Sequence, residues 1–374
     1  MSDSDQQELL STPLLELHRQ WGAKLVPFAG YEMPVQYADG IMSEHLHTRE
    51  NAGLFDVSHM GQVIIKGANV TAELEKIIPV DLQALPINKQ TYGVLTNEQG
   101  GIIDDLIVTR WSDDEFFLVI NAGCKEGDIA HMQANLEGVE ITPLTTQALV
   151  ALQGPKAREV MQQLAPAAGE LTFMNGCHCE IAKQKVYITC SGYTGEDGYE
   201  ISFAAASTDT VINAIMAFDA VKPIGLGARD SLRLEAGLCL YGHDLNTEIS
   251  PIEASLIWSI SKSRRVDGSN AGGFIGSDVI LDQIANGVSR KRVGLKVLSK
   301  MPVREGAELV NEAGEKIGVV TSGGFSPCLQ APIAMGYVST ENATLGTTFN
   351  AQVRKKLVPV EVVKMPFVVQ TYKR

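Results

Sequence analysis

A glycine-broken stretch between residues 190 and 203 holds the side chains best placed to do chemistry. It reads Cys-Ser-Gly-Tyr-Thr-Gly-Glu-Asp-Gly-Tyr-Glu-Ile-Ser-Phe and joins an apolar run at 186–190 to an alternating run at 199–203. This pattern predicts a strand, a turn and a second strand. Because side chains alternate along a strand, Glu200 faces away from the apolar residues beside it. A strand glutamate is usually solvated, but the adjoining glycine-rich loop favours a ligand here.

A second candidate is an arginine on a predicted helix within residues 225–245. Apolar residues recur there every four positions, which gives the helix one apolar stripe. Asp230 and Arg233 are three apart and can pair on the helix surface. Arg229 cannot face Asp230, so its guanidinium is free for an anionic or planar polar ligand, or for water.

Two adjacent aspartates form the third candidate. A Gly-Gly turn at 100–101 precedes a strand that carries Asp104 and Asp105 among isoleucine, leucine and valine. The two carboxylates point to opposite faces. Whichever face is buried holds a carboxylate in apolar surroundings, which is costly outside a functional site. The pattern alone does not choose between them.

Composition limits the class of protein that can carry these residues. The chain has 374 residues, 45% hydrophobic and 20% charged, with a net charge of −13, which fits two or three domains of a globular protein. No apolar stretch is long enough to cross a bilayer. The acidic, polar amino end lacks the features of secretory and organellar signals, so we expect a cytoplasmic protein. The negative charge makes nucleic acid and anionic membranes poor partners.

Cysteines and histidines give no sign of a metal site. The six cysteines show no CxxC spacing, so neither a disulfide framework nor a zinc site is indicated. In the Cys177-His178-Cys179 run an extended chain would turn the histidine away from both sulfurs. His45 and His47 are expected to have no carboxylate or cysteine partner in reach, and two histidines alone do not make a metal site. We therefore expect no metal.

Charge is unevenly spread along the chain. From residue 261 onward there are 16 Lys and Arg against 9 Asp and Glu, although the whole chain is acidic. Such clusters are usually solvated, but a basic third of an acidic protein also suits an acidic protein partner or an anionic ligand. The basic clusters lie at 262–265, 290–292 and 354–356.

Mixed helices and strands must position these residues. Helical spacing predicts helices at 6–21, 43–53, 125–136, 155–164 and 208–218, and strands are expected at 63–65, 93–96, 102–110 and 115–121. Residues 26–37, with two prolines, are expected to form an ordered loop. After residue 287 short strands with turn residues between them predict a separate all-β module, with strands at 292–297, 307–310, 316–322, 334–338 and 347–353.

Eight blocks of sequence, spread over nearly the whole chain, carry a resemblance to a known family. They lie at 28–37, 54–60, 100–105, 151–155, 192–198, 228–242, 321–327 and 364–367, and include Gly-Tyr-Thr-Gly-Glu-Asp-Gly and Gly-Gly-Ile-Ile-Asp-Asp. In this order they resemble the aminomethyltransferase family of the glycine cleavage system, the T-proteins. Eight blocks in register are specific where one alone is not.

The resemblance implies a fold and a set of site residues. The fold is α+β, with three lobes around a central tetrahydrofolate channel: residues 1–283 form the folate-binding region of two interleaved lobes, and residues 284–374 a β-barrel domain. Asp105 matches the essential aspartate near N5 and N10 of the folate. Glu200 matches the glutamate that holds the pterin, whose adjacent N–H and NH₂ donors suit two carboxylate oxygens. The other implied folate-binding residues are Arg229, Tyr372, Tyr92, Met60 and Tyr193.

The resemblance also implies a reaction. The lipoylated H-protein delivers an aminomethyl group as a thioether, loss of the thiolate or of ammonia exposes an iminium-like carbon, and folate N5 attacks it. The products are 5,10-methylenetetrahydrofolate, ammonia and dihydrolipoyl H-protein, with tetrahydrofolate as co-substrate and no metal. Asp105 either stabilises the cation or takes a proton, and general-base catalysis contributes about 10²–10⁴-fold.

Two related functions fit the same scaffold. One is a tetrahydrofolate-dependent demethylase; a flavin-linked one usually carries a dinucleotide-binding domain, and this chain has no GxGxxG unit. The other is a non-catalytic folate-binding protein of iron–sulfur cluster assembly, recognised by a Lys-Gly-Cys motif that this chain lacks. Fold alone does not separate these functions.

Overall fold

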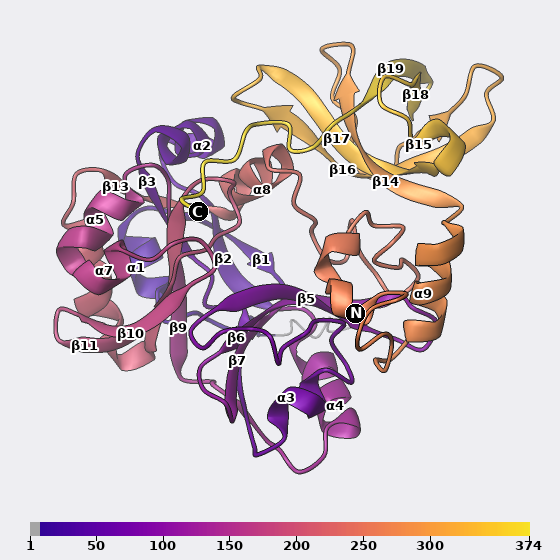
Figure 1. Cartoon of the computed structure of the whole chain (residues 1–374). Helices are drawn as coiled ribbons and strands as arrows, with labels where there is room; N and C mark the ends of the chain where they lie inside the picture. The colour runs from indigo at the N-terminus through magenta and orange to yellow at the C-terminus, as the bar shows by residue number, and fades with distance from the viewer. Residues whose placement is uncertain (1–7) are drawn as a thin grey trace, which may run out of the picture.

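The computed structural model of the chain describes residues 8–374, so nearly all of the acidic start behind the localisation prediction lies outside the described residues. The strands form a two-stranded hairpin, a six-stranded sheet, a five-stranded sheet and a closed six-stranded barrel (Figure 1). The predicted α+β class with a C-terminal barrel is confirmed. Within residues 8–374 no helix combines the length and apolar character that crossing a bilayer requires.

The six-stranded sheet carries the predicted Glu200 strand. Its order is β10-β11-β12-β9-β3-β13. The alternation predicted for 199–203 is confirmed, because Tyr199, Ile201 and Phe203 are buried among side chains of helices α1, α5 and α7. The strands are β3 (Ala52–Asp56), β9 (Gln147–Gln153), β10 (Gly176–Ile181), β11 (Gln184–Thr189), β12 (Gly198–Ala204) and β13 (Val221–Ile224), and the helices α1 (Leu15–Gln20), α5 (Ala157–Leu164) and α7 (Thr208–Met216).

The opposite face of this sheet is covered by helix α8 (Leu226–Glu235), which packs in turn on α2 (Gly40–Glu50). Ala151 lies on this face and contacts the apolar stripe of α8, to which Ala228 belongs. Glu200 is the cross-strand partner of Ala151. Glu200 therefore faces the α8 side of the sheet.

The five-stranded sheet carries the two aspartates. Its order is β5-β6-β7-β4-β8, and the predicted pairing of 102–110 with 115–121 is confirmed as β6 against β7. Helices α3 and α4 close one face with an apolar core. The elements are β4 (Gly61–Lys66), β5 (Gln90–Thr96), β6 (Ile102–Arg110), β7 (Glu115–Ile120), β8 (Glu140–Pro143), α3 (Val70–Leu74) and α4 (Lys125–Asn135).

The barrel closes in the order β14-β17-β16-β15-β18-β19. The five strands predicted after residue 287 are present, and the sixth, 356–363, was missed because it follows a two-residue turn and begins with the last residue of a basic cluster. Helix α9 (Ser277–Asn286) leads into it. The strands are β14 (Arg290–Val297), β15 (Glu308–Val310), β16 (Lys316–Ser326), β17 (Ala331–Ser339), β18 (Thr348–Val353) and β19 (Lys356–Val363).

Two local predictions near the start of the chain were wrong. The helix expected at 6–21 begins only at Leu15, because Pro13 and Leu14 form a turn and Leu10 bridges to Tyr31 instead. The loop expected at 26–37 is a hairpin of β1 (Lys24–Phe28) and β2 (Tyr31–Gln36). Prolines are tolerated there because each strand of a two-stranded sheet has a free edge.

The C-terminal segment returns from the barrel to the first lobes (Figure 1). The backbone N–H groups of Phe367 and Val368 donate to the carbonyl oxygen of Glu235, and that of Thr371 donates to Gly195. These bonds tie the barrel domain to α8 and to the glycine-rich loop. The remaining helices are α6 (Pro166–Gly169) and the short 3₁₀ turns η1 (Ala205–Ser207), η2 (Ile257–Ser259), η3 (Lys262–Arg264) and η4 (Thr340–Asn342).

Candidate active site

Strand β6 places its two aspartates in different surroundings. Asp104 is fully buried, on the face that Leu106 and Val108 turn to the core under α3 and α4. Asp105 lies on the other face and is half-buried. The alternation predicted for the pair is therefore present, and packing decides that Asp104 is enclosed by the sheet's own core.

Asn121, which directly follows β7, holds both carboxylates. Its Nδ2 donates to Asp104 Oδ1 at 2.8 Å and to Asp105 Oδ1 at 2.9 Å, and its backbone N–H donates to Asp104 Oδ2. The hydroxyl of Tyr92 donates to Asp105 Oδ2 at 3.0 Å. Both oxygens of Asp105 are thus held in one orientation. Sequence analysis missed Asn121, although a polar amide at the end of a strand that pairs with the Asp105 strand was a usable signal.

The surroundings of Asp105 raise its proton affinity. Burial and the neighbouring Asp104 raise the pKa of the Asp105 carboxyl to about 7, although the bonds from Tyr92 and Asn121 work in the opposite direction. Asp128 on α4 is buried, and burial together with Asp104 raises its pKa as well. A carboxyl with a pKa near neutrality can accept and return a proton at physiological pH.

Glu200 is linked to the glycine-rich loop. Its Oε2 accepts a hydrogen bond from Ser191 Oγ at 2.6 Å, and among the described residues no side chain donates to Oε1. The loop itself is held by Gln153, which donates to Ser191 O at 2.9 Å and accepts from Thr194 Oγ1 at 2.9 Å. One carboxylate oxygen of Glu200 therefore has no hydrogen-bond donor within residues 8–374.

Arg229 and Tyr193 lie against each other. The guanidinium carbon of Arg229 is 4.7 Å from the centre of the Tyr193 ring, and the Tyr193 hydroxyl donates to the carbonyl of Cys239. Nη1 of Arg229 is buried and has no hydrogen-bond partner among residues 8–374. Burial lowers the pKa of Arg229. A buried, unpartnered guanidinium nitrogen is costly, so it points to a ligand with an acceptor atom.

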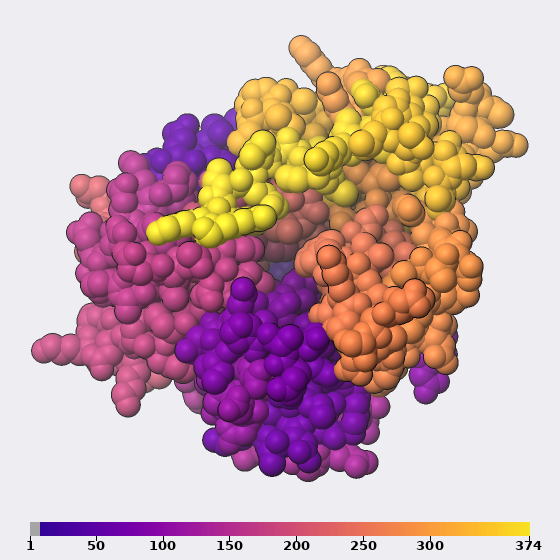
Figure 2. All heavy atoms as spheres, viewed as in Figure 1, coloured from indigo at the N-terminus to yellow at the C-terminus, as the bar shows by residue number. Residues whose placement is uncertain are grey.

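The surface is hollowed between these elements. Figure 2 shows a depression at the centre of one face, bordered by the two sheet regions, in magenta and purple, and by the orange segment that leads into the barrel. Trp258 belongs to that segment and packs against Tyr92, with the ring centroids 5.0 Å apart. Trp258 is 59% exposed. A large exposed aromatic beside Tyr92 offers a flat contact surface that the sequence analysis did not single out.

Comparison with known proteins agrees with this arrangement. Residues 14–264 match the family described as GCVT N-terminal domain, and residues 290–368 match the glycine cleavage T-protein C-terminal barrel domain. The chain belongs to the glycine cleavage T-protein family. This membership supports the predicted aminomethyltransferase function.

Individual T-proteins are similar over almost their full length. The mitochondrial aminomethyltransferase of Dictyostelium discoideum is 43% identical over 99% of this chain and 95% of its own. The probable mitochondrial aminomethyltransferase of Schizosaccharomyces pombe is 45% identical over 97% and 94%. The crystal structure of the glycine cleavage system aminomethyltransferase T of Bartonella henselae is 41% identical, covers 98% of this chain and 100% of that one, and has a TM-score of 0.93.

The two remaining residues implied by the T-protein resemblance, Met60 and Tyr372, lie in separate parts of the structure. Met60 packs at the edge of the α8 core. Tyr372 stacks on Phe173 with ring centres 4.1 Å apart, in the C-terminal segment that bonds to the glycine-rich loop. Residues of that segment, among them Lys364, Tyr372 and Arg374, line a pocket of about 430 Å³. The structure thus pairs Asp105 with Tyr92 and Arg229 with Tyr193. Within residues 8–374 no hydrogen bond or ring contact joins Tyr372 or Met60 to either pair.

Arg233 differs from its prediction in one respect. It does pair with Asp230, with Nη2 2.7 Å from the carboxylate, but it does so from a buried position rather than on the surface. Its Nη1 also pairs with the buried Asp244 at 2.8 Å. Asp244 in turn accepts from Ser322 of the barrel. The ion pair of Arg233 with Asp244, together with the bond from Ser322, therefore links α8 to the barrel.

Most side chains of the first two basic clusters have partners within the protein. Arg264 is buried and pairs with Glu75 at 3.1 Å, and Arg290 pairs with Glu253 at 2.8 Å. Arg292 is buried and donates to the carbonyl of Ala254. By contrast, the cluster at 354–356 is exposed: residues 354 and 355 form the turn between β18 and β19, and Lys356 begins β19. Of the three clusters, this turn is the most accessible to an acidic partner.

Gly192 is expected to be essential to the loop. A Cβ at this position would overlap the amide group of Gln153, which holds the loop through Ser191 and Thr194. Gly192→Ala should lower the free energy of unfolding by about 1–3 kcal/mol, the usual cost of overpacking. Urea unfolding monitored by circular dichroism measures this. Gly123→Ala, where a Cβ would meet nothing within 4 Å, is the matched control and should change stability little; equal effects would contradict the role given to Gln153.

Proposed function

We propose that this chain transfers the methylene of the aminomethyl group on lipoylated H-protein to tetrahydrofolate. The products are 5,10-methylenetetrahydrofolate, ammonia and dihydrolipoyl H-protein. Membership of the T-protein family supports the reaction class. The observation that carries the proposal is Asp105, a half-buried carboxyl held by Tyr92 and Asn121 with its pKa raised to about 7.

In this proposal Asp105 acts as the general base. Its carboxylate accepts the proton that a folate nitrogen loses on forming the new carbon–nitrogen bond, and it returns that proton to solvent. Tyr92 and Asn121 are positioning residues, since their hydrogen bonds fix both carboxylate oxygens. Asp104 raises the proton affinity of Asp105 without facing the ligand side.

Tetrahydrofolate, as co-substrate, fits the donors and acceptors that the chain leaves unused. Arg229 Nη1 is buried and unpartnered among the described residues, which suits an acceptor oxygen of the ligand. Glu200 offers Oε1 to the adjacent N–H and NH₂ donors of a pterin. Tyr193, Tyr92, Met60 and Tyr372 are the further folate-binding residues that we propose, from the T-protein resemblance.

Several broader properties belong to the same proposal. We propose that residues 1–283 form the folate-binding region and 284–374 the barrel domain, that the partner is H-protein rather than nucleic acid or a membrane, and that catalysis needs no metal. We also propose a cytoplasmic location, although relatives from Dictyostelium discoideum and Schizosaccharomyces pombe are named mitochondrial. Fractionation of the source cells with marker enzymes tests the location.

Turnover of aminomethylated H-protein tests the reaction directly. The full chain is mixed with the loaded carrier and tetrahydrofolate, and ammonia and 5,10-methylenetetrahydrofolate are followed together. Equal release of both, dependent on both substrates, is the expected result. A chain that binds tetrahydrofolate but releases neither product contradicts the proposal.

A further inference from the structure

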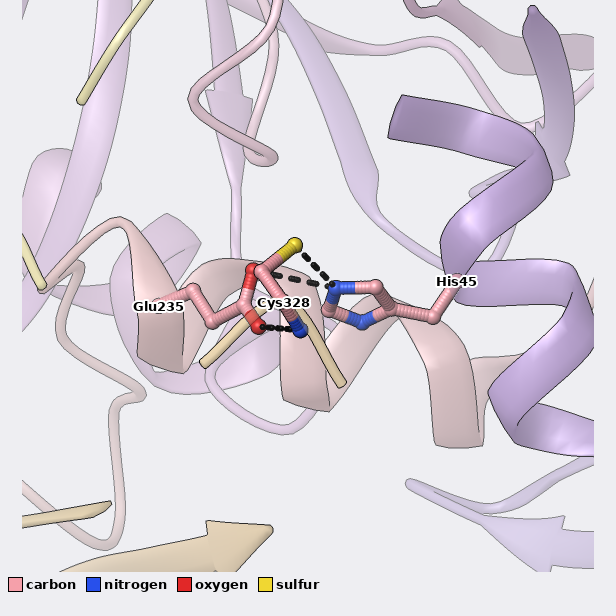
Figure 3. A group of neighbouring side chains, drawn as sticks. All are labelled: His45, Glu235 and Cys328. Carbon is pink, nitrogen blue, oxygen red and sulfur yellow. Dashed lines mark hydrogen bonds and ion pairs between the residues drawn. The ribbon is translucent and has the colours of Figure 1, made fainter. Parts of the chain in front are cut away.

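Two clusters of buried titratable side chains differ in whether a cation balances them. In the first, His45, Glu235 and Cys328 meet where α2, α8 and the turn between β16 and β17 join (Figure 3). The expectation that His45 lacks such partners was wrong, because they come from positions 190 and 283 residues away. Arg49 donates to Glu235 Oε2 through Nη2 at 2.9 Å and Nε at 3.2 Å. This carboxylate therefore has its counter-charge, and the cluster is an ion-paired contact between α2, α8 and the barrel.

The second cluster, Asp104 and Asp128, has no such counter-charge. It lies on the face of β6 opposite Asp105, and both side chains are fully buried, Asp104 on β6 and Asp128 on α4. Neither oxygen of Asp128 has a hydrogen-bond partner among residues 8–374, and the charges that act on it are those of Asp104 and Asp105. A buried carboxylate without donors is costly, so the protonation of this pair needs an explanation.

Asp104 is the ionised member of the pair, because donors reach both of its oxygens. The backbone N–H of Asn121 donates to Oδ2 at 3.0 Å, and Asn121 Nδ2 donates to Oδ1 at 2.8 Å. The thiol of Cys124, which precedes α4, also lies within hydrogen-bonding reach of this carboxylate. Several hydrogen bonds to one carboxylate favour its charged form.

Asp128 is the protonated member. Its carboxyl group lies within hydrogen-bonding reach of Asp104. Two ionised carboxylates at that separation repel each other and have no hydrogen to share, whereas a protonated carboxyl supplies one O–H donor. A proton on Asp128 therefore makes the missing bond and avoids a second buried charge. Burial and the neighbouring Asp104 raise the pKa of the Asp128 carboxyl, in agreement with this geometry.

We propose that Asp128 is protonated near neutral pH and donates its O–H to Asp104, and that this bond keeps one negative charge on Asp104 beside Asp105. Asp128 is then a positioning residue that acts through Asp104. This role rests on the proposed function of Asp105 as general base. Burial and the charge on Asp104 both strengthen the hold of Asp105 on its proton, and they raise its pKa to about 7.

The other titratable groups around the aspartates are neutral or keep a constant charge near neutral pH. Burial raises the pKa of the Cys239 thiol to about 12, and it raises the pKa of the Cys124 thiol as well. Burial also raises the pKa of the phenols that face the pair or Asp105, namely Tyr92, Tyr193 and Tyr241. On α4, burial lowers the pKa of His131, and Lys125 donates to Tyr31. The cations that act on Tyr193 or Cys239 are Arg229, Arg233 and Arg292, and arginine keeps its charge in proteins.

Infrared titration of the full chain detects the proposed proton without any turnover. A protonated carboxyl has a carbonyl stretch that a carboxylate lacks, and difference spectra between parent and variant cancel the other carboxyl groups. In the parent we expect one loss of this band near pH 7, absent from Asp105→Asn. A second loss, at clearly higher pH, should be absent from Asp128→Asn. If the parent and Asp128→Asn have the same spectrum between these two steps, Asp128 carries no proton and the proposal is overturned.

Two substitutions of Asp128 test its effect on Asp105. Asp128→Asn keeps an N–H donor for Asp104, so the step of Asp105 should remain near pH 7. Asp128→Ala removes the donor, so Asp104 takes up a proton more readily and the step of Asp105 should fall by about one pH unit, as expected when a neighbouring like charge is lost. The pH profile of turnover should move by the same amount, with the affinity for tetrahydrofolate unchanged. Equal steps in the two variants would show that Asp128 has no influence on Asp105.

The matched control is Glu126→Gln, which changes an exposed carboxylate on the same helix. It should leave both infrared steps where they are in the parent. Circular dichroism shows whether each variant folds, and the comparison of the parent with Asp128→Asn remains decisive if Asp128→Ala does not. A chain with both steps but no turnover contradicts the proposed reaction and supports the proton on Asp128. A chain with turnover but without the second step contradicts the role of Asp128 alone.

Discussion

Asp105→Asn is expected to lower the turnover of aminomethylated H-protein by about 10²–10⁴-fold, the usual contribution of a general base. The variant should still bind tetrahydrofolate. Asparagine has nearly the shape of aspartate, and its amide group can keep contacts with Tyr92 and Asn121, which now hold the carboxylate. Single-turnover kinetics with loaded carrier, together with fluorescence titration of folate, measures the two quantities separately.

The control for this experiment is Asp219→Asn, which changes an exposed aspartate in the loop between α7 and β13. It should leave turnover unchanged. If Asp105→Asn keeps more than a tenth of the parent turnover, Asp105 is not the general base. If folate binding falls in parallel with turnover, its role is in binding instead.

The pH dependence of turnover is a second, independent test of the role of Asp105. The pKa of its carboxyl in the folded protein is about 7, above the ordinary value of 3.8. Turnover should therefore rise with pH up to about 7 and level off above it, because the base acts in its ionised form. A profile that is flat between pH 5 and about 8 would argue for an electrostatic role without proton transfer.

The same shift links Asp105 to stability. Between the ordinary pKa of 3.8 and about 7 the folded chain binds more protons at Asp105 than the unfolded chain does. Its contribution to stability is thus complete at low pH and is lost as pH rises through 7. Asp105→Asn removes this loss, so the variant should resist urea better than the parent above pH 7. Such a gain in stability with a loss of turnover is typical of active-site residues.

Glu200→Gln is expected to weaken tetrahydrofolate binding by about 10–100-fold, since a charge-assisted hydrogen bond contributes about 1.5–3 kcal/mol. The substituted amide keeps one acceptor for Ser191 Oγ, which now donates at 2.6 Å. It loses the negative charge and presents a donor where the pterin also presents donors. Isothermal titration with tetrahydrofolate measures the affinity, and the effect on KM should exceed that on kcat.

Glu180→Gln is the matched control for Glu200. It removes an exposed carboxylate from β10 of the same sheet. It should change neither folate affinity nor turnover. A Glu200→Gln variant with parent-like affinity would contradict the assignment of Glu200 to the pterin, whatever the outcome for Asp105.

Sequence by itself determined the elements in which a period of two is strong. Along β12 the alternation of Tyr199, Ile201 and Phe203 with Glu200 predicted both the strand and its buried face. Short β runs with turn residues predicted a separate all-β module, and the structure shows that this module is a closed barrel. Prediction from sequence failed at two places near the start of the chain. The prolines at 27 and 34 argued against the hairpin that forms there, and the spacing of the leucines before residue 15 predicted helix where there is none.

Only the tertiary structure decided what each candidate side chain faces. Alternation places Asp104 and Asp105 on opposite faces, but the packing of α3 and α4 determines which face becomes core. Three features depend on chain segments far apart in sequence: the bonds of Asn121 to both aspartates, the Nη1 of Arg229 without a partner among residues 8–374, and the contact of His45 with Cys328. Local periodicity reports the environment of a residue's own element, whereas long-range packing brings distant elements together, and so local pattern alone could not show these contacts.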